Sequence, residues 1–329
     1  MMPFDYRRAP DPEAAVAAAT GSAEVAFLAG GTNLVDHLKL GVAAPGVLVD
    51  ITRLPLDTVD ALPDGGLRIG ATVRNADLAA HPAVRRDYPV LARALLSGAS
   101  GQIRNLATTG GNLLQRTRCV YFRDPSTPCN KREPGTGCSA IGGYTRHHAI
   151  LGASAHCVAT HPSDMAVAMA ALDAQVAVLG AAGRRVVPLV GLHRSPGDEP
   201  HRDTVLAPGD LITSVDLPPP PPGARSVYRK VRDRASFAFA LVSVAAVLRV
   251  EGGVVRDVRI ALGGVAHRPW RARRAEDVLV GARADDEVFR RAVDAELAGA
   301  APLGGNRFKV PLTRELVVSA LRGLSREER

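Results

Sequence analysis

All four cysteines of this 329-residue chain lie in one short window, at Cys119, Cys129, Cys138 and Cys157. A chain that used cysteine as a small core residue would scatter it, so the clustering indicates a site that needs four sulfurs. Disulfides are typical of small secreted domains, which this chain is not. Structural zinc sites usually contain paired C-x-x-C knuckles, and the window has none. An iron–sulfur cluster needs four thiolates and tolerates wide, irregular spacing.

The residues around the cysteines favour the cluster over zinc or free thiols. Cations lower the pKa of neighbouring thiols and offset the negative charge of a thiolate-bound cluster. Only Asp124 and Glu133 oppose the cations, which are Arg116, Arg118, Arg123, Lys131, Arg132 and Arg146. Zinc and free thiols stay open on spacing and charge alone. The nearby histidines are interpreted as polar loop residues and not as ligands, and they are His147, His148, His156 and His161.

Two glycine-containing loops could hold a phosphate-bearing ligand. AGGTNL (29–34) follows an apolar run and precedes a helical pattern, and its glycines would let backbone N–H groups approach an anion. The same loop could simply be a turn that needs a positive φ. TTGGN (108–112) offers two hydroxyls, two glycines and one amide within five residues. Together the loops suit a ligand with two phosphates and a sugar chain, such as a dinucleotide.

Alternating strand and helix patterns must position these residues. Residues 75–98 predict one helix, with Asn75 as its N-cap and Gly98 at its end. Residues 164–180 predict a helix that runs into a strand, and the window 115–148 predicts a loop. The length of the chain is enough for two domains.

Composition excludes several classes of function. The formal charge is +8, but only four of the 41 cationic residues are lysines, which indicates a general arginine bias. No basic run is interleaved with stacking aromatics, so nucleic-acid binding is not predicted. The chain has no apolar run of about 18 residues and no secretory signal pattern. A cytoplasmic location is therefore expected, with periplasmic export alongside a signal-bearing partner as the alternative.

Four collinear segments carry a resemblance to a known family. They are FLAGGTNLVDHLK (27–39), GASGQIRNLATTGGNLL (98–114), PSDMAVAMAALDA (162–174) and YRKVRDRASFAFALVSVAAVL (228–248). The chain resembles the FAD-binding medium subunits of the xanthine dehydrogenase family of molybdenum hydroxylases, which are similar to vanillyl-alcohol-oxidase-type flavoproteins.

The resemblance implies an α+β fold with two domains. A PCMH-type FAD-binding domain over 1–217 would consist of two α/β subdomains, about 1–54 and 55–217. The proline-rich segment 218–223, PPPPPG, would be a stiff linker, because consecutive prolines cannot join a helix interior or a sheet ladder. A C-terminal α+β domain of the CO dehydrogenase flavoprotein type would occupy 224–329.

The resemblance also implies roles for individual residues. The first loop and its flanks would wrap the FAD diphosphate, and they are Leu28, Ala29, Gly30, Gly31, Thr32, Asn33 and Leu34. The second loop would hold the other side of the cofactor through Thr108, Thr109, Gly111, Asn112 and Gln115. Asp164 would bond ribityl or ribose hydroxyls, or else cap a helix beside Ser163. Lys230 would lie near the flavin ring, or else be a surface lysine.

Many members of the family run straight from the second loop into the helix expected at Asp164, whereas here a long segment intervenes. This insertion, 115–157, resembles one in the flavin subunits of bacterial periplasmic aldehyde oxidoreductases, where it carries a [4Fe-4S] cluster. The resemblance therefore implies that Cys119, Cys129, Cys138 and Cys157 are cluster ligands.

The implied function is electron transfer without substrate chemistry in this chain, so no catalytic residue is predicted. A large partner with molybdenum cofactor would oxidise an aldehyde, aromatic by expectation, to its acid. A small partner with two [2Fe-2S] clusters would pass electrons to FAD here, and FAD would reduce an external acceptor. One alternative is a stand-alone FAD oxidase of related fold with structural zinc in the cysteine loop. A third hypothesis is a cluster-bearing binding or sensor module.

Overall fold

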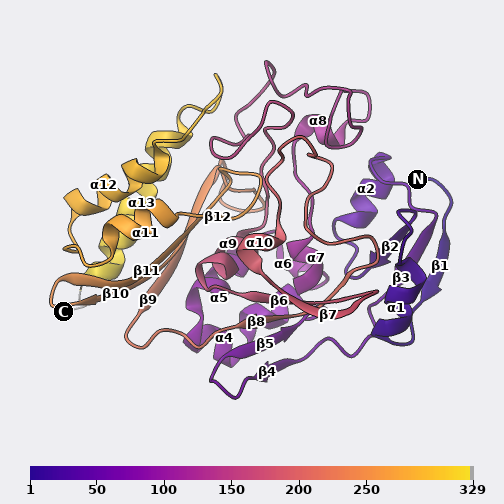
Figure 1. Ribbon diagram of the computed structural model, residues 1–329, viewed down its shortest axis with the longest axis horizontal. Coiled ribbons are helices and arrows are strands. Elements are labelled where there is room, and N and C mark those ends of the chain that lie inside the picture. The colour runs from indigo at the N-terminus through magenta and orange to yellow at the C-terminus, as the bar shows by residue number, and fades with distance from the viewer. Residues whose placement is uncertain (327–329) are drawn as a thin grey trace.

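The computed structural model describes residues 1–326 and contains three β-sheets with helices packed around them (Figure 1). The three sheets follow one another along the chain, and the cysteine window lies at the top of that view. No helix within the described residues is long and apolar enough to cross a membrane. The mixture of helices and sheets confirms the expected α+β class.

The N-terminal sheet is parallel, with the strand order β1-β3-β2. Its elements are β1 (Asp5–Arg8), α1 (Pro12–Ala19), β2 (Val25–Leu28), α2 (Leu34–Leu40) and β3 (Val47–Asp50). The connection from β2 to α2 leaves residues 29–33 as a loop at the carboxyl edge of the sheet. That edge is where open parallel sheets bind their ligands.

The central sheet is antiparallel, with the strand order β4-β5-β8-β6-β7. Its strands are β4 (Val59–Ala61), β5 (Leu67–Gly70), β6 (Gln175–Gly180), β7 (Gly183–Pro188) and β8 (Leu211–Leu217). The helices of this region are α3 (Asn75–Ala80), α4 (Pro82–Asp87), α5 (Pro89–Ser97), α6 (Gly101–Arg104), α7 (Thr109–Leu113), α9 (Asp164–Ala171) and α10 (Leu189–Leu192). Every residue of α9 is buried, and α9 is packed against both α5 and the C-terminal sheet.

The single helix predicted for residues 75–98 is wrong, because the chain forms three short helices there. Pro82 and Pro89 each occupy the first turn of a new helix, where their missing N–H is harmless. Asn75 is not a cap but a buried residue inside the first turn of α3. Gly98 does end the last helix, as expected. The predicted helix followed by a strand over 164–180 is confirmed as α9 and β6.

The cysteine window is irregular apart from one helical turn, α8 (Val120–Arg123). Cys129 and Cys138 face each other in a short antiparallel bridge. Asp203, in the loop after α10, anchors the window by pairing with Arg116 at 2.6 Å and with the buried Lys131. These two cations hold the pKa of the Asp203 carboxyl well below its usual value.

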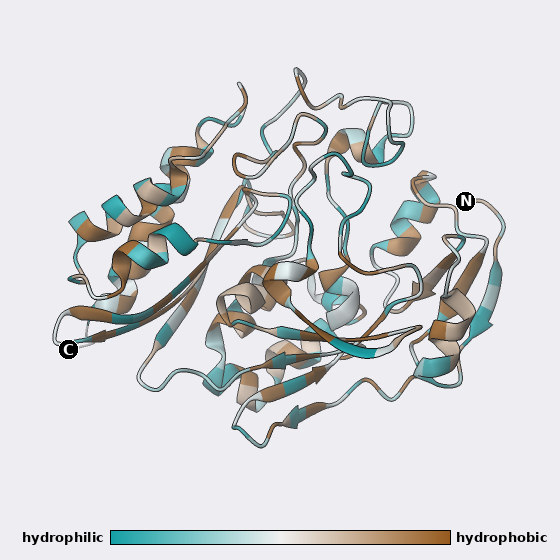
Figure 2. Ribbon diagram, in the orientation of Figure 1, coloured by the Kyte–Doolittle hydropathy of each residue, from teal (hydrophilic) through white to brown (hydrophobic). Residues whose placement is uncertain are grey.

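The C-terminal sheet is antiparallel, with the strand order β12-β11-β10-β9, and three helices cover it. Its elements are β9 (Arg225–Val231), β10 (Val242–Glu251), β11 (Val254–Gly263), β12 (Trp270–Arg271), α11 (Arg273–Leu279), α12 (Asp286–Leu297) and α13 (Lys309–Ser325). Apolar residues run along β10 and β11 and along the inner faces of the helices (Figure 2).

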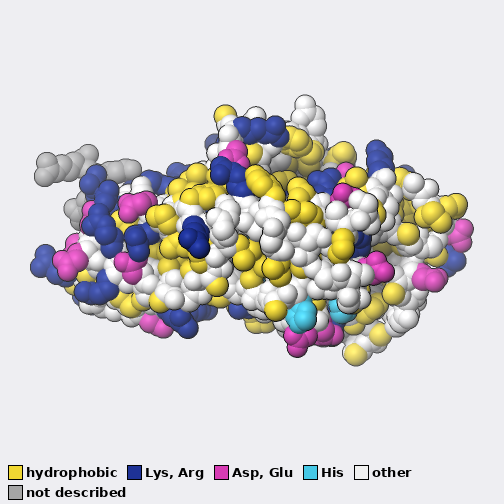
Figure 3. Space-filling model, turned by 90° about the horizontal axis from the view of Figure 1, so that it is seen from above, with side chains coloured by type: hydrophobic (Ala, Val, Ile, Leu, Met, Phe, Trp, Pro, Cys, Tyr) yellow, Lys and Arg dark blue, Asp and Glu magenta, His cyan; other side chains and the backbone are white. Residues whose placement is uncertain are grey.

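The face that carries the cysteine window has apolar side chains across its middle (Figure 3). Over the C-terminal helices, Lys and Arg side chains are interspersed with Asp and Glu. Several of them pair across helices, such as Arg322 with Asp286 at 2.5 Å. Many of the cations at this surface are thus paired locally with carboxylates.

Candidate functional site

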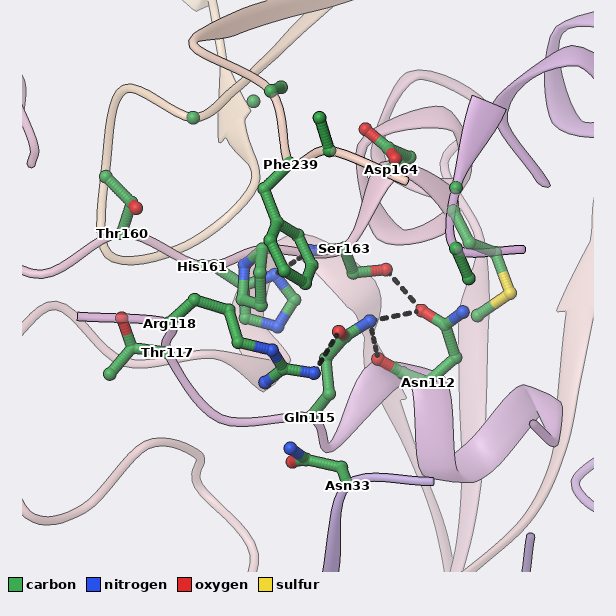
Figure 4. A pocket seen from close by; sticks show the side chains of 18 of the residues that line it. Asn33, Asn112, Gln115, Thr117, Arg118, Thr160, His161, Ser163, Asp164 and Phe239 are labelled. Carbon is green, nitrogen blue, oxygen red and sulfur yellow. Dashed lines mark hydrogen bonds between the residues drawn. The ribbon is translucent and has the colours of Figure 1, made fainter. Parts of the chain in front are cut away.

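A cavity of about 840 Å³ lies between the two glycine loops, the cysteine window and the loop after β9 (Figure 4). This volume is in the range of cofactor and ligand pockets, about 300–1,000 Å³. Of the fourteen residues predicted to bind the flavin, six line the cavity, and they are Thr32, Asn33, Gly111, Asn112, Gln115 and Asp164.

The first glycine loop is built for close approach of the backbone. Gly31 has φ +70°, a left-handed conformation that favours glycine. A Cβ on Gly30 would lie 2.0 Å from the Leu106 carbonyl oxygen, so only glycine lets the two loops pack together. Within residues 1–326, the backbone N–H groups of Gly30, Gly31 and Thr32 have no acceptor. Free N–H groups on three consecutive residues, the last of which lines the cavity, are suited to a phosphate group.

The second loop contributes a hydrogen-bonded frame. Thr108 caps α7 by accepting from the Gly111 N–H at 3.3 Å. The Asn112 side chain donates to Asn75 at 2.6 Å and accepts from Gln115 at 2.8 Å. Its Oδ1 also accepts from the Ser163 hydroxyl, at the start of α9 (Figure 4). These bonds fix the cavity wall before any ligand binds.

Asp164 and Lys230 form a buried ion pair. The Lys230 Nζ lies 2.7 Å from Asp164 Oδ2 and also donates to the Ser97 carbonyl at 3.0 Å. The other Asp164 oxygen accepts from the Tyr228 hydroxyl. Ser163 is the residue that caps α9, so the capping role considered for Asp164 belongs to its neighbour. Lys230 is buried and is not a surface lysine.

Within residues 1–326, the other eight predicted residues do not line the cavity. Leu28 ends β2, Ala29 and Gly30 continue the loop, and Leu34 begins α2. Thr109 is fully buried, and its hydroxyl donates to the Val73 carbonyl at 3.1 Å.

The four cysteines line one small cavity, which they share with Lys131. Cys129 and Cys157 are buried, and Cys119 and Cys138 are half-buried. Burial raises the pKa of Cys119 to about 11 and the pKa of Cys157 to about 12, the latter opposed by Lys131. The thiols of Cys119 and Cys157 are therefore protonated at neutral pH, and a metal must displace those protons to bind there.

The arrangement of the sulfurs suits a cluster. No group of three or more His, Cys, Asp or Glu side chains in the described part of the chain is arranged to hold a single metal ion. Tetrahedral zinc needs every sulfur about 2.3 Å from one centre, whereas each thiolate of a cubane binds its own iron. Four thiols that line one cavity are the donor set that a cubane uses.

One of the four histidines near the window contacts a cysteine. His148 Nε2 lies 3.1 Å from Cys119 Sγ. Burial lowers the pKa of His148 to about 4, so its ring is neutral at pH 7. His161, by contrast, contacts the Leu113 carbonyl oxygen, and His156 lies at the surface near Asp198. Only His148 is placed to influence a cysteine sulfur directly.

Sequence reasoning missed Arg118 and Phe239 as residues of the larger cavity. Both line it, and the Arg118 guanidinium lies 5.0 Å from the centre of the Phe239 ring. Cys119 lines both cavities and so forms part of the wall between them. The feature of the sequence that could have identified Arg118 is its position directly before the first cysteine.

Comparison with known proteins agrees with this geometry. Residues 2–220 match the family described as FAD binding domain in molybdopterin dehydrogenase, and residues 226–324 match the CO dehydrogenase flavoprotein C-terminal domain. The chain belongs to the FAD-binding medium-subunit family of the molybdenum hydroxylases.

Among the relatives is the aldehyde oxidoreductase FAD-binding subunit PaoB of Escherichia coli strain K12, 52% identical over 98% of each chain. The glyceraldehyde dehydrogenase medium chain of Sulfolobus acidocaldarius is 27% identical over 87% of this chain and 84% of its own length. A solved structure of CO dehydrogenase from Oligotropha carboxidovorans superposes with a TM-score of 0.78, at 25% identity over 99% of each chain. This chain is therefore an oxidoreductase subunit with an FAD-binding domain.

Proposed function

We propose that this chain is the FAD- and [4Fe-4S]-binding electron-transfer subunit of a heterotrimeric molybdenum-containing aldehyde oxidoreductase. The observation that carries the cluster assignment is the convergence of all four cysteines on one cavity, whose wall at Cys119 also borders the larger cavity. The 52% identity with a subunit named for aldehyde oxidation supports the reaction class. Aromatic aldehydes are our proposed substrate class.

FAD, when bound, supplies the ability to accept and release electrons singly or in pairs. The chain's own residues provide position and exclude water. The N–H groups of Gly30, Gly31 and Thr32 would hold a phosphate, and Asn112 and Gln115 would bond polar atoms of the cofactor. In our proposal, electrons arrive from [2Fe-2S] clusters of a small partner subunit and leave to an external acceptor. A large partner with molybdenum cofactor performs the aldehyde chemistry.

Metal and flavin analysis of the anaerobically purified chain tests the cofactor assignment. We expect flavin absorption bands, a broad shoulder that bleaches on reduction, and about four irons per chain. Cys129→Ser should abolish the iron while flavin stays bound, and Ser126→Ala, in the same window but outside the lining of the cavity, should keep both. Zinc in place of iron, or full iron in Cys129→Ser, would contradict the cluster assignment. Absence of flavin would contradict the proposal as a whole.

Purification of the untagged complex tests the electron-transfer role. The complex should oxidise an aromatic aldehyde faster than an aliphatic one, and it should contain molybdenum in its largest subunit. The isolated chain should not oxidise either aldehyde. Aldehyde turnover by the chain alone would refute the proposal, and an aliphatic preference would refute only the substrate class.

A further inference from the structure

Arg118 is a partly desolvated cation whose contacts do not satisfy its charge. Its guanidinium donates only to neutral acceptors, the Arg116 carbonyl at 2.6 Å and the Gln115 side chain at 3.4 Å. Within residues 1–326, no carboxylate lies within 4.0 Å of Arg118. Its neighbours differ, since Arg116 pairs with Asp203 and Arg123 pairs with Asp36, each at 2.6 Å.

The guanidinium is held in the wall of the larger cavity, where the two glycine loops meet. Phe239 lies on one side at 5.0 Å, and Gln115, which is bonded to Asn112, contacts it on another (Figure 4). The Arg116 backbone N–H donates to the Asn33 side chain at 2.9 Å, which brings the first glycine loop next to this segment. A planar cation that lines the same cavity as Thr32, whose backbone N–H has no acceptor within residues 1–326, is suited to a phosphate, which it can bind in bidentate fashion.

We propose that Arg118 binds the diphosphate of the dinucleotide and that it couples this binding to assembly of the cysteine site. The second part rests on the proposed cluster function. Arg118 and Cys119 are adjacent in an irregular segment, yet only Cys119 reaches the cysteine cavity while both line the larger one. Fixing the Cys119 sulfur therefore also fixes the backbone from which Arg118 extends. A site ordered in advance by one ligand binds the second more tightly, and the effect is reciprocal.

Calorimetric titration of the full chain with FAD, ADP and riboflavin tests the first part. A charge-assisted hydrogen bond to phosphate predicts that Arg118→Ala weakens FAD and ADP binding by about 10- to 100-fold and leaves riboflavin binding unchanged. Arg118→Lys should recover part of the loss. The control Arg290→Ala removes an exposed cation from α12, none of whose residues lines this cavity, and should change FAD binding by less than about threefold. Unchanged ADP affinity, or a loss confined to riboflavin, would overturn the assignment.

Titration with and without the cluster tests the coupling. Iron-loaded wild-type chain should bind FAD about tenfold more tightly than chain from which iron has been chelated. Arg118→Ala should show the same FAD affinity in both states. Iron-loaded wild type with no gain in FAD affinity would overturn the coupling while leaving the cluster assignment intact. A wild-type chain that never contains iron would instead overturn the proposed function.

Discussion

Replacing Lys230 with methionine would leave the Asp164 carboxylate buried without its cation. The two side chains are 3% and 7% exposed, and the charged atoms are 2.7 Å apart. Lys230 also bonds Ser97 at the end of α5, and Asp164 also bonds Tyr228. A single ion pair thus joins α5 and α9 of the N-terminal part of the chain to β9 of the C-terminal sheet.

The expected loss of stability follows from this burial. Removing one partner of a buried ion pair typically costs about 3–5 kcal/mol. The Tyr228 hydroxyl still donates to Asp164, so we expect Lys230→Met to lower the free energy of unfolding by about 3 kcal/mol. Asp164→Leu should cost a similar amount, because it leaves the ammonium with only the Ser97 carbonyl. The double variant removes both charges and should cost about 2 kcal/mol less than the sum of the singles.

Urea unfolding of the flavin-free chain at pH 7, followed by circular dichroism, measures these differences. Lys39→Met removes an exposed lysine from α2 and should change stability by less than about 0.5 kcal/mol. A lysine that served only the flavin ring would behave differently: its loss would leave the flavin-free chain as stable as wild type and weaken FAD binding alone. That pattern, or additive effects of the two single changes, would refute a structural ion pair.

Three further predictions concern the first glycine loop and two buried basic side chains. Gly30→Ala places a Cβ against the Leu106 carbonyl, so we expect flavin content after purification to fall about tenfold, measured by absorbance. Burial lowers the pKa of His37 to about 4, so the unfolded chain binds the proton first on acidification. Wild type should lose about 2 kcal/mol of stability from pH 7 to pH 5 relative to His37→Gln, and parallel urea midpoints would contradict this. Burial lowers the pKa of Lys309 to about 7, so the folded chain releases its proton first as pH rises. Wild type should gain about 2 kcal/mol from pH 7 to pH 9 relative to Lys309→Met, and equal thermal unfolding shifts in both would exclude it.

Local patterns predicted the parts of this chain that depend on local chemistry. The glycine loop at 29–34 and the helix followed by a strand over 164–180 have the form that the sequence indicated. The error at 75–98 was avoidable, because Pro82 and Pro89 lie inside the predicted helix and each begins a new one. Asn75 was assigned from position alone, and its buried bond to Asn112 joins residues 37 apart that no local pattern connects.

The charges in the cysteine window predicted less about the structure than the other sequence patterns did. Six cations were expected to offset the charge of one cluster, but the fold gives them separate tasks. Lys131 lines the cysteine cavity, and Arg132 donates to backbone carbonyls of its own loop. Arg146 pairs with Asp233 on the C-terminal side at 2.5 Å. Proximity in sequence placed these residues in one window, and only tertiary contacts determined which of them faces a sulfur.

The position of the two ends of the insertion explains why the insertion is connected to the larger cavity. Asn112 and Ser163 lie 51 residues apart in sequence, yet their side chains form a hydrogen bond in the wall of that cavity. The carbonyl oxygen of Leu113, just before the insertion, contacts the ring of His161, just after it. Both ends of the insertion are held close together by these contacts. The entropic cost of closing a loop rises only slowly with loop length, so a long segment between the two ends adds little to that cost. The same fixed ends mean that any ordering of the segment by a bound cluster is transmitted first to the residues that line the flavin cavity. The coupling that we propose between the two sites follows from where the segment is inserted, and in that proposal Arg118 is the charged residue that carries it.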